Sequence, residues 1–185
     1  MAGAGRCCRR NLKWKHSHMA LEIERKFLVA KDRLGPLRDG EEVSQGFIAT
    51  VDVSAVRVRV AGERAWLTIK GENVGARRSE FEYAIPMEDA RQILEEFCDG
   101  SVIRKTRYRR QYQGHEWEID VFHGDNSGLV IAEVELRSET ESPAIPDWVI
   151  AEVTGEPRYY NVNLAGHPFN QWEDHKAEGP KSSKL

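Results

Sequence analysis

Charged and apolar residues alternate along most segments of this chain that have a strand-forming composition. In the first such segment, Leu21–Val29, an extended backbone places Leu21, Ile23 and Phe27 on one face and two glutamates and a lysine on the other. The same period of two recurs in six later segments. This pattern predicts a mainly β fold in which nearly every strand has one charged face.

Turn-forming sequences separate these segments, among them Ala61-Gly62-Glu63 and Gln113-Gly114. Eight antiparallel strands at this spacing are typical of a barrel or a sandwich. The predicted strands are Leu21–Val29, Val43–Thr50, Ala55–Ala61, Arg64–Lys70, Ser79–Ile85, Ile103–Gln111, His115–Phe122 and Leu129–Ser138.

One amphipathic helix interrupts the strands. It is expected to begin at Pro86, with acidic residues in its first turn, and to stop near Gly100. Its apolar stripe is Ala90, Ile93, Leu94 and Phe97. Shorter helical turns are expected within Lys31–Leu37, Pro146–Val153 and Pro157–Leu164.

The charges are sorted by sign from strand to strand. Carboxylates dominate the first, fifth, seventh and eighth strands, and Arg and Lys dominate the third, fourth and sixth. Like charges two residues apart repel, strongly if they are desolvated. Two arrangements fit this pattern: a sheet with one solvated face, or a closed barrel with its charged faces inward and its apolar faces covered by helices. In the barrel, a divalent cation would neutralise the carboxylates and a polyanion such as phosphate the cations.

The chain of 185 residues fits one domain. Residues 1–18 have no strand or helix period and end in His-Ser-His before Met19, which predicts an expression tag or a disordered arm. The domain is expected over residues 19–170. The polar residues 171–185 predict a disordered tail.

Composition excludes several classes of partner. Without the five Arg and Lys of residues 1–18, 22 basic side chains remain against 30 acidic ones, a poor balance for binding nucleic acid. No apolar run approaches the ~18 residues that span a bilayer, so no membrane association is expected. Cys98 is the single cysteine after residue 18, which indicates a reducing, cytoplasmic compartment.

An ordered set of motifs between about Ala20 and Leu164 resembles the CYTH superfamily, the triphosphate tunnel metalloenzymes. The likeness is greatest to the small bacterial inorganic tripolyphosphatases. The motifs are Glu22-x-Glu24-x-Lys26, Arg57-x-Arg59, Leu67-Thr68-Ile69-Lys70, Glu80-x-Glu82, Lys105-Thr106-Arg107, Asp120 and Glu133-x-Glu135. The resemblance implies an α+β, mainly β fold, a closed eight-stranded antiparallel barrel with helices packed outside. It therefore favours the charged tunnel over the solvated sheet.

The resemblance also implies roles for single residues. The ligands of Mg²⁺ or Mn²⁺ would be Glu22, Glu24, Asp120, Glu133 and Glu135, with Glu118 in the same acidic patch. The triphosphate would contact Lys26, Arg57, Arg59, Lys70, Glu80, Glu82, Lys105, Arg107 and Arg158, the last in a segment that plugs one end. The catalytic residues would be Glu22, Glu24, Lys26 and Asp120.

The function implied is metal-dependent hydrolysis of a triphosphate, foremost inorganic tripolyphosphate, by water attack on a terminal phosphoryl group. One alternative within the superfamily is a class IV-type adenylyl cyclase or a thiamine or nucleoside triphosphatase. Another is a non-enzymatic module that binds polyphosphate or nucleotide. The expected partner is a small-molecule triphosphate. The sequence neither predicts nor excludes a homodimer.

Two positions depart from the family pattern. Phe47 stands where such tripolyphosphatases often carry Tyr, so either a tunnel hydroxyl is missing or the ring simply packs. Pro157 stands where the plug segment often carries Lys. Both departures bear on substrate preference rather than on the triphosphate site itself.

Overall fold

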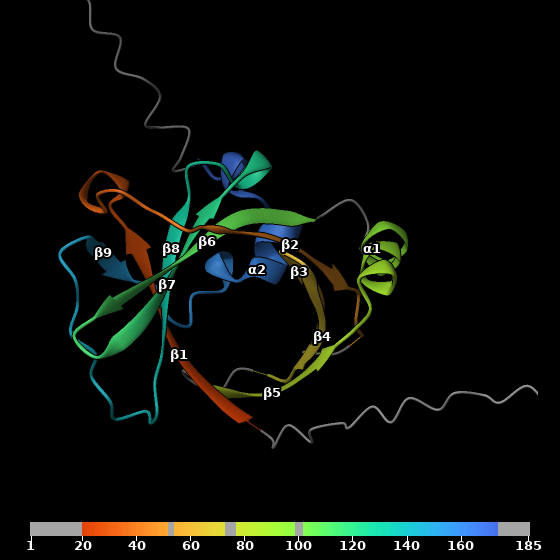
Figure 1. The fold of residues 1–185 in the computed structure, drawn as a ribbon, viewed down its shortest axis with the longest axis horizontal. Helices are drawn as coiled ribbons and strands as arrows, with labels where there is room; N and C mark the ends of the chain where they lie inside the picture. Colours follow the sequence, from red (N-terminus) through yellow and green to blue (C-terminus); the bar gives the residue numbers. More distant parts are fainter. Residues whose placement is uncertain (1–19, 52–53, 73–76, 99–101, 174–185) are drawn as a thin grey trace, which may run out of the picture.

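Eight antiparallel strands close into a barrel in the computed structural model, which describes residues 20–51, 54–72, 77–98 and 102–173 (Figure 1). The strand order is β5-β4-β3-β2-β6-β7-β8-β1, and pairing of β1 with β5 closes the barrel. The strands are β1 Ala20–Val29, β2 Glu41–Ile48, β3 Ala55–Ala61, β4 Arg64–Lys70, β5 Arg77–Ala84, β6 Ile103–Tyr112, β7 His115–Phe122, β8 Val130–Glu135 and β9 Val149–Glu152. The closed eight-stranded barrel predicted from the motifs is confirmed.

The helical elements lie outside the barrel wall and at one of its ends. They are η1 Lys31–Arg33, α1 Met87–Glu96, η2 Gly124–Asn126, η3 Pro157–Tyr159, α2 Asn161–Gly166 and η4 Phe169–Gln171. Among the described residues, no helix reaches the length and apolarity needed to cross a membrane.

The strand faces divide as the alternation predicts. On β7, Trp117 and Ile119 belong to an outer apolar cluster, while Glu118 faces the barrel interior. On β4, Lys70 faces inward and Ile69 is exposed on the outside. The interior is therefore charged because the apolar side of each strand has gone to the outside.

The α1 helix covers the outer face of β2, β3 and β4. Its Ala90 packs with Val58 and Ala65, and Ile93 and Leu94 lie against the same cluster. Phe97 does not complete the stripe as expected, because the chain leaves helical geometry there (φ −121°) and leaves the ring 57% exposed.

The segment expected to be a helical turn at Pro146–Val153 instead contains the strand β9, which pairs with β1. β5 pairs with β1 from Ala20 to Ile23 and then diverges, so the edge of β1 from Phe27 to Val29 is left for β9. An unpaired edge offers a row of backbone hydrogen bonds, which an adjacent β-branched segment can satisfy. A strand and loops therefore cover this wall, where helices were expected.

The C-terminal elements η3, α2 and η4 close one end of the barrel. Tyr159, Leu164 and Trp172 pack with inward-facing apolar residues of the wall, including Ile103 and Phe122. Phe47 packs against this cluster, so its ring serves the plug. Trp172 lies in the segment that the sequence assigned to the tail, and its side chain is buried. Residues 1–19 and 174–185 lie outside the described residues.

Candidate active site inside the barrel

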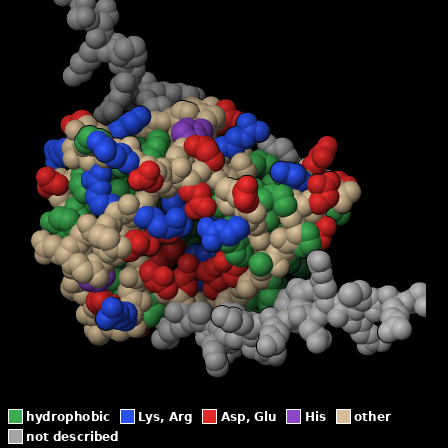
Figure 2. All heavy atoms as spheres, in the orientation of Figure 1, with side chains coloured by type: hydrophobic (Ala, Val, Ile, Leu, Met, Phe, Trp, Pro, Cys, Tyr) green, Lys and Arg blue, Asp and Glu red, His purple; other side chains and the backbone are tan. Residues whose placement is uncertain are grey.

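A cavity of about 280 Å³ occupies the barrel interior, and charged side chains form almost all of its lining. Figure 2 shows the hollow from the open end, with carboxylates gathered on one side and cations on the other. The lining residues are Glu22, Glu24, Lys26, Arg57, Arg59, Lys70, Arg78, Glu80, Glu82, Arg107, Arg109, Glu118, Glu133, Tyr160 and Asn161. The structure thus brings together most of the residues that the motifs predicted.

The acidic wall is built by β1 and β8, which pair side by side. Their register sets Glu24 opposite Glu135 and Lys26 opposite Glu133. A second cavity of about 550 Å³ lies against this wall, and Glu22, Glu24 and Glu135 line it. Burial and the neighbouring glutamates Glu22 and Glu118 raise the pKa of Glu135, as expected for carboxylates that repel one another.

Cations hold the two carboxylates of β1 in place. Lys70 Nζ lies 3.1 Å from Glu22 Oε2, and Arg78 Nε donates to the same oxygen at 2.7 Å. Arg78 also reaches Glu24, with Nη2 to Oε1 at 3.2 Å. Burial alone would raise the pKa of Glu24, but Lys26 and Arg78 overcome it and lower that pKa. Glu24 is therefore ionised and available to a cation.

The basic wall is built by β3, β4 and β5. Arg59 Nη2 donates to Glu82 at 3.1 Å, and Lys70 lies 2.8 Å from Glu80. Thr68 also donates to Glu82, at 2.9 Å. Glu82 therefore acts here as a counter-ion of the basic wall, whereas burial and the neighbouring Glu22 raise the pKa of Glu80 to about 7.

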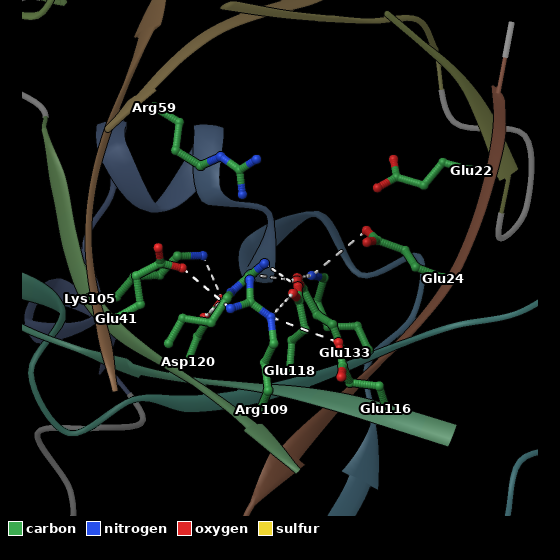
Figure 3. A network of polar contacts seen from close by, with 12 residues as sticks. Glu22, Glu24, Glu41, Arg59, Lys105, Arg109, Glu116, Glu118, Asp120 and Glu133 are labelled. Carbon is green, nitrogen blue, oxygen red and sulfur yellow. Dashed lines mark hydrogen bonds and ion pairs between the residues drawn. The ribbon is translucent and has the colours of Figure 1, made fainter. Parts of the chain in front are cut away.

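Asp120 lies at the base of the cavity with both of its oxygens engaged (Figure 3). Arg107 Nε donates to Oδ1 at 2.7 Å and Nη2 to Oδ2 at 2.6 Å, a bidentate pair, and Lys105 Nζ also donates to Oδ2. Asp120 and Lys105 are each 1% exposed. Burial lowers the pKa of Lys105 to about 7, although Asp120 opposes the change. The group holds two cations in fixed positions beneath the cavity.

Lys26 and Arg107 connect this group to the acidic wall. Lys26 donates to Glu133 Oε1, and Arg107 Nη2 donates to Glu133 Oε2 at 3.0 Å. Arg107 also donates to Glu118. Glu22, Glu24 and Glu133 are thus each paired with a cation that could bind a phosphate oxygen instead.

Arg78 is a cavity residue that lies one position before the predicted strand Ser79–Ile85. β5 begins at Arg77, two residues earlier than predicted, which gives Arg78 the same inward direction as Glu80 and Glu82. Arg78, Glu80 and Glu82 are spaced two residues apart, so an extended backbone points all three side chains the same way. This spacing is the sequence signal that identifies Arg78 as a cavity residue.

Arg158 lies apart from the other predicted substrate contacts. Its guanidinium stacks on Trp172, with Cζ 4.2 Å from the ring centroid, and also lies over Tyr159. Its neighbours Tyr160 and Asn161 line the cavity in its place. Pro157, the other departure from the family pattern, lines an adjoining pocket near α2.

The donor set of the acidic wall fits a hard divalent cation, because it consists of carboxylate oxygens alone. Among the described residues, no three His, Cys, Asp or Glu side chains are gathered closely enough to hold an ion. The glutamates are instead drawn toward Lys26, Lys70 and Arg78. Those cations supply the positive charge that a metal would otherwise supply to the same oxygens.

Comparison with known proteins identifies the family. The model of the CYTH domain matches residues 20–164. An inorganic triphosphatase of Acetivibrio thermocellus is 45% identical over 156 residues, which cover 84% of this chain and 100% of that protein. An inorganic triphosphatase of Nitrosomonas europaea is 38% identical over 148 residues, covering 78% and 96%. A solved structure of the inorganic triphosphatase NE1496 superposes with a TM-score of 0.57 at 35% identity, covering 80% of this chain and 97% of that one. With its barrel, its opposed walls and these matches, the chain belongs to the CYTH-domain family.

Proposed function

We propose that this protein hydrolyses inorganic tripolyphosphate with the help of a divalent cation. The observation that carries the proposal is the opposition of a carboxylate wall and a cation wall around one enclosed cavity. A linear anion with several charges and its counter-cation would neutralise both walls at once. The two relatives named inorganic triphosphatase support this substrate.

The basic wall and the base of the cavity bind the anion. Arg57 and Arg59 suit paired phosphate oxygens, because a guanidinium donates bidentately, while Lys26 and Lys70 act as point charges. Arg107 and Lys105, fixed by Asp120, extend this surface across the barrel. Such preorganised cations stabilise charge on the phosphoryl oxygens in the transition state. Asp120 serves the reaction by positioning these two cations, since its own oxygens are occupied.

Glu22, Glu24, Glu133 and Glu135 would hold Mg²⁺ or Mn²⁺. When bound, such an ion neutralises phosphate charge and lowers the pKa of a coordinated water. Oxygens of Glu22, Glu24 and Glu133 now contact Lys26, Lys70 and Arg78, and these three cations could also bind oxygens of the substrate. We propose Mg²⁺ or Mn²⁺ on ligand chemistry alone.

Water is the nucleophile in this proposal. Among the residues that the structure describes, the lining of the central cavity contains no Ser, Thr, Cys or His, and Tyr160 supplies its one hydroxyl. Phosphoryl transfer needs alignment and charge stabilisation more than covalent help from the protein. Mass spectrometry during turnover is expected to find no phosphorylated side chain, and a phosphorylated residue would contradict direct attack by water.

Phosphate release from tripolyphosphate, ATP, thiamine triphosphate and pyrophosphate, each with Mg²⁺ and with Mn²⁺, tests the substrate. Tripolyphosphate should give the highest kcat/KM. A cyclic-AMP assay on ATP tests the alternative of a class IV-type adenylyl cyclase. Preference for an organic triphosphate would replace the inorganic substrate while keeping the reaction class.

Glu24→Gln tests the acidic wall. It should lower metal-dependent kcat by at least about a hundredfold, because one ligand charge is lost while the side-chain shape is kept. Glu88→Gln, on the exposed face of α1, is the matched control. Normal turnover by Glu24→Gln would refute the metal assignment.

The catalytic domain, predicted over residues 19–170, extends in the structure at least to the buried Trp172. In this proposal it acts in the cytoplasm, without nucleic acid or membrane. Sedimentation velocity measures the oligomeric state and distinguishes a monomer from a homodimer.

A further inference from the structure

Gln45 is a buried amide that no group of the described protein satisfies. Its side chain is 0% exposed, and both Nε2 and Oε1 lack a hydrogen-bond partner within the described residues. A buried polar group in this state destabilises the fold, because it has lost its hydrogen bonds with water and gained none in return. An apolar side chain would avoid that cost, so the amide is expected to have a partner in another state of the protein.

The side chain points into the barrel. On β2, a Cβ at Gly46 would meet Cys98 and Leu94 on the outer side, so residue 46 faces α1. Successive residues of a strand face opposite ways, which directs Gln45 inward. Its cross-strand partners are Arg59 on β3 and Ile103 on β6.

The two arginines beside it show the same deficit. Arg57 Nε and Arg59 Nε are buried and have no acceptor in the part of the chain that the structure describes, although the ends of both guanidinium groups reach Glu82. Directly opposed residues of neighbouring strands have Cβ atoms about 5 Å apart, so Gln45 and Arg59 are adjacent. Together, Gln45 Nε2, Arg57 Nε and Arg59 Nε are three buried N–H groups on one stretch of wall without an acceptor.

We propose that Gln45 is a further substrate-binding residue, whose amide N–H donates to an oxygen of the same phosphoryl group that Arg57 and Arg59 bind. A phosphoryl group carries enough acceptors for all three donors, and no acceptor of the described protein meets them. When the anion binds, the guanidinium groups of Arg57 and Arg59 move from Glu82 to the phosphoryl oxygens. The amide of Gln45 then becomes accessible to the same phosphoryl group. This inference rests on the proposed function, because it takes the anion to be a polyphosphate.

Gln45→Leu and Gln45→Glu test the assignment. Leu keeps most of the volume and removes both polar atoms. Glu keeps the shape but removes the donor and adds a charge that repels the anion. Binding of tripolyphosphate is measured by calorimetry in EDTA, which separates affinity from turnover. Gln45→Leu should weaken binding about tenfold or more and raise KM more than it lowers kcat, and Gln45→Glu should weaken binding further.

A purely structural role for Gln45 gives the opposite result. Gln45→Leu would then raise the melting temperature, because an unsatisfied amide is removed, and leave affinity and KM unchanged. That outcome would overturn the inference. Ser44→Ala, on the other face of β2, is the matched control, and Gln45→Met replaces Gln45→Leu if the branched side chain prevents folding.

Failure of this inference is distinguishable from failure of the proposed function. Wild-type protein that binds tripolyphosphate without hydrolysing it would refute the reaction and leave the comparison of affinities intact. Wild-type protein that hydrolyses tripolyphosphate, with unchanged affinity in Gln45→Leu and Gln45→Glu, would refute the role of Gln45 alone. Wild-type protein that binds no polyphosphate would refute both.

Discussion

At the level of single residues, Asp120 is a buried carboxylate with both of its oxygens bound to cations. It neutralises Lys105 and Arg107 in a region with almost no solvent contact. Asp120→Asn would leave Lys105 buried without its counter-charge and Arg107 with Glu118 and Glu133 alone, and breaking a buried ion pair in this way costs about 3–5 kcal/mol.

Urea unfolding in EDTA measures this loss for Asp120→Asn. Asp147→Asn, an exposed position, should change the free energy of unfolding by less than about 0.5 kcal/mol. A loss for Asp120→Asn no larger than that of the control would contradict the structural role given to the pair.

Arg78 binds Glu22 and Glu24 and lines the cavity, so its charge serves both walls. Arg78→Gln should lower kcat/KM for tripolyphosphate about ten- to hundredfold, the range expected when hydrogen bonds to charged groups are lost. Steady-state phosphate release measures the effect. Arg91→Gln, exposed on α1, should match wild type, and equal activity of both variants would remove Arg78 from the site.

At the level of elements, the contact of α1 with β2 depends on the missing side chain of Gly46. A Cβ there would lie 2.6 Å from the Cβ and Sγ atoms of Cys98. Gly46→Ala should therefore lower the free energy of unfolding by about 1–3 kcal/mol, the usual cost of overpacking. Thermal unfolding compares it with Gly166→Ala, where a Cβ would meet nothing within 4 Å. Equal stability of the two variants would show that α1 can shift.

The strand β9 is tied to β1 by an ion pair as well as by its backbone. Arg25 Nε donates to Glu152 Oε1 at 2.8 Å, and this bond lowers the pKa of Glu152 below its ordinary value of 4.5. Since the folded state holds that proton less tightly, the stabilisation is present above pH 4.5 and is lost as the pH falls through the folded pKa.

Urea unfolding of wild type and Glu152→Gln between pH 3 and pH 7 measures this contribution. The difference in stability should be greatest near pH 7 and should vanish under acid conditions. It should be small, because the pair is partly exposed and screened. A difference that grows as the pH falls would contradict the sign.

At the level of the whole molecule, the barrel interior places a wall of carboxylates opposite a wall of cations. The ion pairs between the two walls neutralise only part of their charge. A polyanion that binds only the folded state stabilises it by an amount that grows with the logarithm of ligand concentration, about 2.7 kcal/mol at a hundred times Kd. Tripolyphosphate in EDTA should therefore raise the melting temperature, and orthophosphate at equal concentration should raise it less. Thermal scans at constant ionic strength measure the difference, and equal shifts from both anions would argue against a site built for a chain of phosphates.

Much of this molecule follows from local sequence. The alternation in Ala55–Ala61 predicts a strand that carries Arg57 and Arg59 on the same face, and the structure confirms this. The start of β5 does not follow, because two consecutive arginines, Arg77 and Arg78, interrupt the alternation of apolar and charged residues, and the predicted strand therefore begins at Ser79. The strand at Val149–Glu152 was also missed, because it exists only where β1 has an edge that β5 leaves unpaired.

The sequence by itself determined which residues share a strand face, since that depends only on the two-residue period of an extended backbone. Through its ordered motifs it also determined the family. Tertiary structure alone decided which face lies inside, because closure depends on the pairing of β1 with β5, two strands distant in sequence. It also decided that Asp120 holds cations, that Arg158 stacks on Trp172, and that Gln45 is buried without a partner. Each of these outcomes depends on distances between strands, which no local pattern encodes.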